Sequence, residues 1–328
     1  MDPYAVFHAP FLDMANYFDG TSVHYQVGGI IRNYDYDALL VGTSMTEAID
    51  PSIIDKIFGG KTTRAIVYGA FAQDYCDLFK EIGNAGKADY VILGLDAATI
   101  TLPVDEHRIS NLYDYVYSPN FFTDSEYLWC DYTALYEAPR MLFSNLTGNT
   151  NDVKTFCIPK PSKFGEEKVI PEIKRREKWD EKRLSELEMK CKLNVNAIVK
   201  AAYSCKNIPT YIFIPPYSIA YWYRLYNEGT LDIQLKYMHD LYSGLLHYKN
   251  IRIFFEMIDQ NIITNLNNYR DIHHYNPATS EKIMYDIAMG NNEITVSNLN
   301  ATFANFKSFL ESYDWKQFEE KYVDAKKP

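Results

Sequence analysis

Five short apolar runs constrain the fold of this chain more than any other feature. They lie at residues 38–41, 64–68, 90–95, 210–214 and 251–255, with helical patterns between several of them. Continuous apolar runs of this kind are typical of parallel strands that are covered on both faces. Strands that alternate with helices form βαβ units with right-handed crossovers. The sequence therefore predicts an α/β fold of three layers, α/β/α, around a five-stranded and mostly parallel sheet.

The interval between the third and fourth runs is too long for an ordinary connection. We interpret residues 97–205 as an insertion within a single domain that covers residues 1–328. The first half of the insertion is rich in tyrosine, and its second half, from Glu172 on, has the composition of a charged helix. We expect the insertion to fold over the sheet and to cap the edge that carries the site.

Composition argues against several classes of function. The formal net charge is −10, and the densest basic run, residues 174–178, is interrupted by an acidic residue, so we expect no nucleic-acid partner. The five cysteines are scattered and the seven histidines lack metal-ligand spacing, so we expect no disulfide scaffold, no metal and no cofactor. Residues 59–62 resemble half of a P-loop, but they precede a strand instead of following one.

The first predicted strand ends in a candidate nucleophile. Gly42, Thr43 and Ser44 follow residues 38–41 directly, so a serine hydroxyl is expected at the carboxyl edge of the sheet, where open α/β sheets bind ligands. Serine is a good nucleophile only when a neighbouring base takes its proton and a third group orients that base. The alternative interpretation is a Gly-Thr-Ser turn that caps a helix.

A candidate base lies far downstream, after the last predicted strand. Asp271 and His274 are three residues apart, so on one turn the carboxylate can reach the imidazole and hold its orientation. His273 is a competing base at Asp-x-His spacing. The alternative interpretation is an aspartate that caps a turn beside two surface histidines.

Taken together, these two segments resemble the first and last blocks of the SGNH (GDSL-type) hydrolase superfamily. Ser44 matches the nucleophile of the first block, and Asp271 and His274 match the Asp-x-x-His of the last. The first block departs from the family at Thr43, where the family has an aspartate. His273 lies outside the family pattern.

The middle blocks of the family are matched less completely. Gly69, which follows the second predicted strand, matches the glycine of the second block. The third block is Gly-x-Asn-Asp in the family, but Leu95 and Asp96 follow Gly94 here, so the asparagine is missing. One oxyanion donor is therefore unassigned, and losing one such donor typically costs about 10²–10³ in turnover.

The resemblance implies a flavodoxin-like SGNH hydrolase fold and a serine mechanism. Ser44 would attack an acyl ester, His274 would move the proton, Asp271 would orient His274, and the N–H groups of Ser44 and Gly69 would form the oxyanion hole. The implied activity is that of an esterase or O-acyltransferase on an acylated small molecule or glycan. The alternative is a catalytically weak or inactive SGNH-fold protein that binds or assembles other components of the cell envelope.

The resemblance also implies a location. The most similar branch consists of membrane-anchored bacterial proteins, several of them linked to acyl groups on cell-surface polymers, which implies an extracytoplasmic protein. No apolar run here approaches the ~20 residues that a membrane span requires. We therefore expect this segment to be soluble, with membrane contact only through a segment outside it.

Two further sets of residues are candidates for binding substrate. Tyr217 and Ser218 follow the fourth predicted strand, where they are expected either to line the substrate cleft or to form a rigid turn with the two preceding prolines. Tyrosines of the insertion are expected either to bind sugar rings or to pack the insertion onto the sheet. They are Tyr113, Tyr115, Tyr117, Tyr127, Tyr132 and Tyr136.

Overall fold

A six-stranded sheet organises the structure, which is a computed structural model. The structure describes residues 26–108 and 163–324, together with short pieces at residues 5, 7–9, 135–136, 139–140, 142–143 and 146–147. The strand order is β2-β1-β3-β4-β5-β6. The strands are β1 (Ala38–Gly42), β2 (Thr62–Ile66), β3 (Tyr90–Gly94), β4 (Thr210–Ile214), β5 (Ile251–Phe255) and β6 (Glu293–Ile294).

The α/β class predicted from the sequence is confirmed, but the predicted number of strands is wrong. Strands β1 to β5 are parallel, and β6 pairs with β5 in the antiparallel direction. The sequence did not indicate β6 because it pairs over only two residues, Glu293 and Ile294. A strand that short leaves no apolar run and no alternation to detect.

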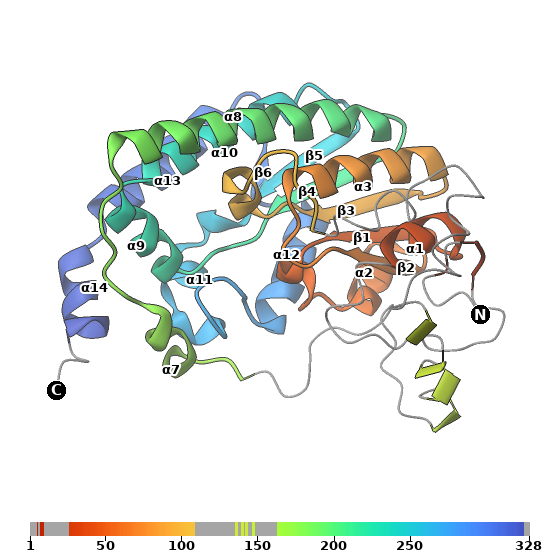
Figure 1. The fold of residues 1–328 in the computed structure, drawn as a ribbon, viewed down its shortest axis with the longest axis horizontal. Coiled ribbons are helices and arrows are strands. Elements are labelled where there is room, and N and C mark those ends of the chain that lie inside the picture. The colour runs from red at the N-terminus through yellow and green to blue at the C-terminus, as the bar shows by residue number, and fades with distance from the viewer. Residues whose placement is uncertain are drawn as a thin grey trace.

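Helices cover the sheet, and their mutual contacts define two layers. One layer contains α3 (Ala72–Ala85), α8 (Glu181–Ala202), α10 (Leu231–Leu245) and α13 (Leu299–Ser312), which pack on one another. In Figure 1, α8 lies across the top of the view above the sheet, and α2 lies below the sheet. There α2 (Pro51–Phe58) packs against α12 (Pro277–Met289). The sheet is buried between the layers, and β1 is buried along its whole length.

The remaining elements are shorter or peripheral. Within residues 26–108 and 163–324, the other α-helices are α1 (Val27–Asn33), α7 (Glu166–Val169), α9 (Ile219–Glu228), α11 (Gln260–Thr264) and α14 (Trp315–Tyr322). The 3₁₀ helices of these two ranges are η2 (Ser44–Thr46), η3 (Ala97–Thr101), η4 (Ile170–Glu172), η5 (Tyr203–Cys205), η6 (Glu256–Ile258) and η7 (Leu266–Asn268). Among the described residues, no helix is both long enough and apolar enough to cross a membrane.

The second half of the predicted insertion contains α8, and the expectation that the insertion caps the site stays a prediction. This helix packs on α3 and α10 within a helical layer, because parallel strands β3 and β4 need a crossover helix between them. Residues 163–173 do reach the carboxyl edge of the sheet, where the Gly165 N–H donates to the Tyr269 carbonyl at 2.9 Å. Most of residues 109–162 lie outside the described residues.

Candidate active site

The turn after β1 presents Ser44 at the carboxyl edge of the sheet. A Cβ atom on Gly42 would lie 2.9 Å from the Gly94 carbonyl oxygen and 2.5 Å from Thr46, so only glycine allows β1 and β3 to approach this closely before the turn. Thr43 then caps the 3₁₀ helix η2 by accepting a hydrogen bond from the Met45 N–H at 3.2 Å. Ser44 is the first residue of η2. The turn thus combines the predicted helix cap with an accessible hydroxyl.

The loop that contains the candidate base is closed by its own backbone. Tyr269 and Tyr275 form an antiparallel bridge, and the Arg270 N–H donates to the His274 carbonyl at 3.0 Å. Within the loop, one oxygen of Asp271 accepts the backbone N–H groups of His273 at 2.7 Å and His274 at 2.8 Å. The aspartate therefore fixes the backbone beside the histidine as well as the histidine side chain.

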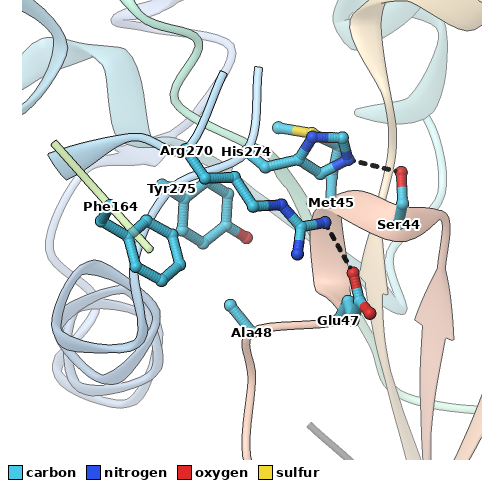
Figure 2. A pocket seen from close by; sticks show the side chains of 8 residues that line it. All are labelled: Ser44, Met45, Glu47, Ala48, Phe164, Arg270, His274 and Tyr275. Carbon is cyan, nitrogen blue, oxygen red and sulfur yellow. Dashed lines mark hydrogen bonds and ion pairs between the residues drawn. The ribbon is translucent and has the colours of Figure 1, made fainter. Parts of the chain in front are cut away.

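The structure brings Ser44, His274 and Asp271 together in the predicted order. Ser44 Oγ lies 2.7 Å from His274 Nε2 although the two residues are 230 positions apart (Figure 2). His274 Nδ1 lies 2.6 Å from Asp271 Oδ2. Burial alone would raise the pKa of Asp271, but the hydrogen bonds and charge of His274 outweigh burial and hold that pKa well below its usual range. Asp271 is therefore a carboxylate that stabilises a positive charge on the imidazole.

The competing base, His273, faces a different environment. Its ring packs edge-on against the rings of Tyr217 and Tyr221, with centroids 5.8 and 5.4 Å away. Burial and the positive charge of Arg224 lower the pKa of His273 to about 4. His274 contacts the Ser44 hydroxyl, whereas the ring of His273 packs against Tyr217 and Tyr221.

The oxyanion side of the site is less complete. Gly69 lies at the same edge, in an exposed turn just after β2, with a left-handed φ of +63°. The adjoining strand end is held by the Val67 N–H, which donates to the Gly42 carbonyl at 2.9 Å. The proposed contribution of the Gly69 N–H to an oxyanion hole stays a prediction.

Asp96, the second residue after Gly94, stands where the family resemblance leads us to expect an asparagine, and it accepts hydrogen bonds from its surroundings. Its carboxylate receives the Tyr217 hydroxyl, the Ala98 N–H at 2.9 Å and the Thr43 hydroxyl at 3.3 Å. An ionised carboxylate only accepts hydrogen bonds, so it cannot replace the amide donor. Asp96 instead connects the turns after β1 and β4, because it accepts hydrogen bonds from Thr43 of the first turn and Tyr217 of the second.

Tyr217 and Ser218 do not line a cleft, contrary to one of the two expectations. Both side chains are 0% exposed, because the turn after β4 directs them into the core. The Ser218 hydroxyl donates to the Ile272 carbonyl at 2.7 Å, and the Tyr269 hydroxyl donates to the Pro216 carbonyl at 3.1 Å. These residues hold the His274 loop in place.

A small hollow with a volume of about 10 Å³ opens beside the serine. It is lined by Ser44, Met45, Glu47, Ala48, Phe164, Arg270, His274 and Tyr275 (Figure 2). An ion pair of 2.8 Å between Glu47 and Arg270 forms part of the wall. Sequence reasoning missed this pair, although Glu47 follows Ser44 by three residues and Arg270 directly precedes Asp271. Their proximity to the candidate catalytic residues was the available signal.

The other predicted binding residues are mostly outside the described part of the chain. This applies to every tyrosine named in the insertion except Tyr136, whose side chain is 55% exposed. Within the described residues, no group of three or more His, Cys, Asp or Glu side chains is arranged to hold a metal ion. Comparison of the chain with protein-family models, with curated proteins and with solved structures finds no match.

Proposed function

We propose that this chain is a serine-dependent ester hydrolase or O-acyltransferase with an SGNH-type, flavodoxin-like fold. The observation that carries the proposal is the unbroken contact from Ser44 through His274 to Asp271. The strand order adds support, because 2-1-3-4-5 is a doubly wound order whose ligand site lies where the order reverses, between β1 and β3. Ser44 follows β1 at that point.

The chemistry follows from the roles of the three side chains. His274 Nε2 takes the Ser44 proton as the oxygen attacks the ester carbonyl, and the carboxylate of Asp271 stabilises the resulting imidazolium. Backbone N–H groups, for which we propose Ser44 and Gly69, stabilise the oxyanion. His274 then protonates the departing alcohol, which leaves an acyl group on Ser44. Water or a sugar hydroxyl, deprotonated by His274, resolves this acyl-enzyme.

For the substrate we propose acyl esters of a cell-surface polysaccharide, and for the location an extracytoplasmic, membrane-anchored protein. Both proposals rest on the family resemblance. The ion pair between Glu47 and Arg270 lines the hollow beside Ser44 and would present polar groups to a substrate there.

A second candidate function, a non-catalytic envelope protein with the same fold, is favoured by one observation. Asp96 stands where the family has an amide donor, and its carboxylate is occupied by Tyr217, Ala98 and Thr43. A site that lacks this donor stabilises the oxyanion less well. Such a site can retain ligand binding after it has lost turnover.

Reaction with a fluorophosphonate probe tests the proposed function. The wild-type protein should be labelled at Ser44, and Ser44→Ala should abolish labelling and the hydrolysis of p-nitrophenyl acetate. Ser52→Ala is a matched control, because Ser52 is an exposed serine in α2, and this variant should be labelled at the wild-type rate. Equal labelling of wild type and Ser44→Ala would contradict the serine mechanism. An unlabelled wild-type protein that still binds an acylated glycan would favour the non-catalytic function.

A further inference from the structure

An ion pair connects the two segments that carry the candidate catalytic residues. Arg270 Nη2 lies 2.8 Å from Glu47 Oε2. Glu47 belongs to the turn of Ser44, and Arg270 belongs to the loop of His274. The Glu47 side chain is only 6% exposed and that of Arg270 is 22% exposed. A charge buried to this extent is destabilising unless it is paired, so the pair constrains both segments strongly.

Glu47 is coupled rigidly to the nucleophile. Its N–H donates to the Ser44 carbonyl at 3.2 Å, so the two residues lie on one turn of 3₁₀ helix. Its own carbonyl accepts a hydrogen bond from the Arg64 guanidinium of β2 at 3.3 Å. Burial and the charge of the Glu47 carboxylate raise the pKa of Tyr68 to about 12. Any displacement of Glu47 therefore displaces Ser44.

Arg270 is coupled in the same way to the base. Its N–H donates to the His274 carbonyl at 3.0 Å, across the closed loop. Its guanidinium Nε also lies 3.9 Å from Asp271 Oδ2. Figure 2 shows the guanidinium group extending from the His274 side of the hollow to Glu47 on the Ser44 side. The ion pair and the Ser44–His274 hydrogen bond thus form two parallel links between the same segments.

We propose that Glu47 and Arg270 are positioning residues whose ion pair sets the distance between Ser44 Oγ and His274 Nε2. The inference rests on the proposed function and extends it, since it assigns a role to two residues that do not take part in proton transfer. Reacting groups misplaced by about 1 Å can lose about 10²-fold in rate. A link parallel to the reacting hydrogen bond controls this distance directly, so it affects the chemical step more than the binding of substrate.

A double-mutant cycle tests the proposal. The variants are Glu47→Gln, Arg270→Gln and the double variant, with kcat, KM and the rate of fluorophosphonate labelling measured for each. Each single variant should lower kcat and the labelling rate by about 10-fold or more while KM changes by less than about threefold, as expected for a group that acts on the chemical step. The double variant should be no slower than the slower single variant, because the second change removes a link that is already broken.

Two further variants separate positioning from general stability. Arg270→Lys keeps the charge and should recover part of the lost kcat. Glu293→Gln breaks the Arg252–Glu293 ion pair of 2.6 Å, which joins β5 to β6 outside the site, and should leave kcat unchanged. Thermal unfolding of every variant shows whether it is folded. If Glu47→Gln does not fold, the comparison of Arg270→Gln with Arg270→Lys decides the question through kcat and KM.

Three outcomes would overturn the proposal. Rates within about twofold of wild type in both single variants would show that the pair does not position the residues. Multiplicative losses in the double variant would show that the two side chains act independently. A rise in KM with unchanged kcat would show that the pair binds substrate instead. Absence of labelling in the wild-type protein is a separate result, because it removes the proposed function and this inference together.

Discussion

The two halves of the candidate site differ in the groups that form them. The proton-transfer half consists of side chains from distant segments, Ser44 with His274 and Asp271, and all of its contacts are short. The proposed oxyanion half would depend on the backbone N–H groups of Ser44 and Gly69, and the carboxylate of Asp96, which accepts the Tyr217 hydroxyl, supplies no further donor. A site can therefore hold its nucleophile and base in full contact while its stabilisation of the transition state is reduced. Such a site is expected to label readily with a reactive probe and to turn over ester slowly.

The largest effect should come from breaking the proton-transfer half. His274→Gln should lower kcat and the labelling rate by about 10³-fold or more, since Ser44 then has no base. His273→Gln is the matched control, because its ring packs on Tyr217 and Tyr221 away from the nucleophile. This control should retain kcat within about threefold per folded molecule. The reverse pattern would assign the base to His273.

A smaller effect is expected from the oxyanion half, at Gly69. Gly69→Ala should cost about 1 kcal/mol of stability, because φ is +63° there, and should lower kcat by about 10-fold through a displaced N–H. Gly59→Ala is the matched control. Gly59 has φ of +80°, and an added Cβ meets nothing within 4 Å.

The control variant should lose at least as much stability, because Gly59 combines its positive φ with a ψ of 168°, a conformation found essentially only in glycine, and it should lose no activity. The measurements are the free energy of unfolding in urea and kcat for p-nitrophenyl acetate. If Gly69→Ala and Gly59→Ala have equal kcat, the Gly69 N–H does not contact the oxyanion, and the match to the second block of the family is accidental.

Asp96→Asn should change the rate least. The amide oxygen can still accept from Tyr217 and Ala98, and the new NH₂ group can donate to Thr43. We expect kcat to stay within about threefold of wild type. A gain of about 10-fold or more would mean that the amide reaches the oxyanion, which would make the two halves of the site equally complete. The measurement is kcat for p-nitrophenyl acetate.

The buried His273 should also make stability depend on pH. The pKa of His273 is lowered to about 4 in the folded state from an ordinary value near 6.5. Between these values the unfolded chain binds the proton more readily, so stability contributed by neutral His273 is lost as pH falls from about 6.5 towards 4. His273→Gln should flatten this part of the stability profile. Urea unfolding at several pH values measures it, and an unchanged profile would contradict the buried, neutral state of His273.

Much of the fold was predictable because it depends on local patterns. All five predicted runs overlap the parallel strands, although β2 begins at Thr62, two residues before the predicted run. An apolar run indicates burial on both faces wherever the neighbouring strands lie. The role of α8 was not predictable in the same way, since its composition indicates a helix but not the layer that the helix joins.

The candidate site was predictable where local spacing reflects geometry and, for the contact between Ser44 and His274, from the family resemblance. Asp271 and His274 lie on one turn, so their contact follows from a separation of three residues. Burial of Tyr217 and the pairing of Glu47 with Arg270 depend on segments that are far apart in the sequence. A tyrosine after a strand can face the solvent or the core, and the sequence alone does not distinguish these cases. The carboxylate of Asp96 was visible as a missing donor, but its three hydrogen-bond partners were not.

The separation between Ser44 and His274 has a consequence for how the protein folds. Their hydrogen bond closes a loop of 230 positions, and contacts of such high sequence separation form slowly, because chain entropy must be lost before they can form. The loop contains β2 to β5, so the nucleophile and base meet only once the central strands are in register. A chain arrested at an earlier point can contain most of its helices and still have an inert serine. The rate at which Ser44 becomes reactive towards the probe during refolding therefore measures the rate of the final ordering of the sheet.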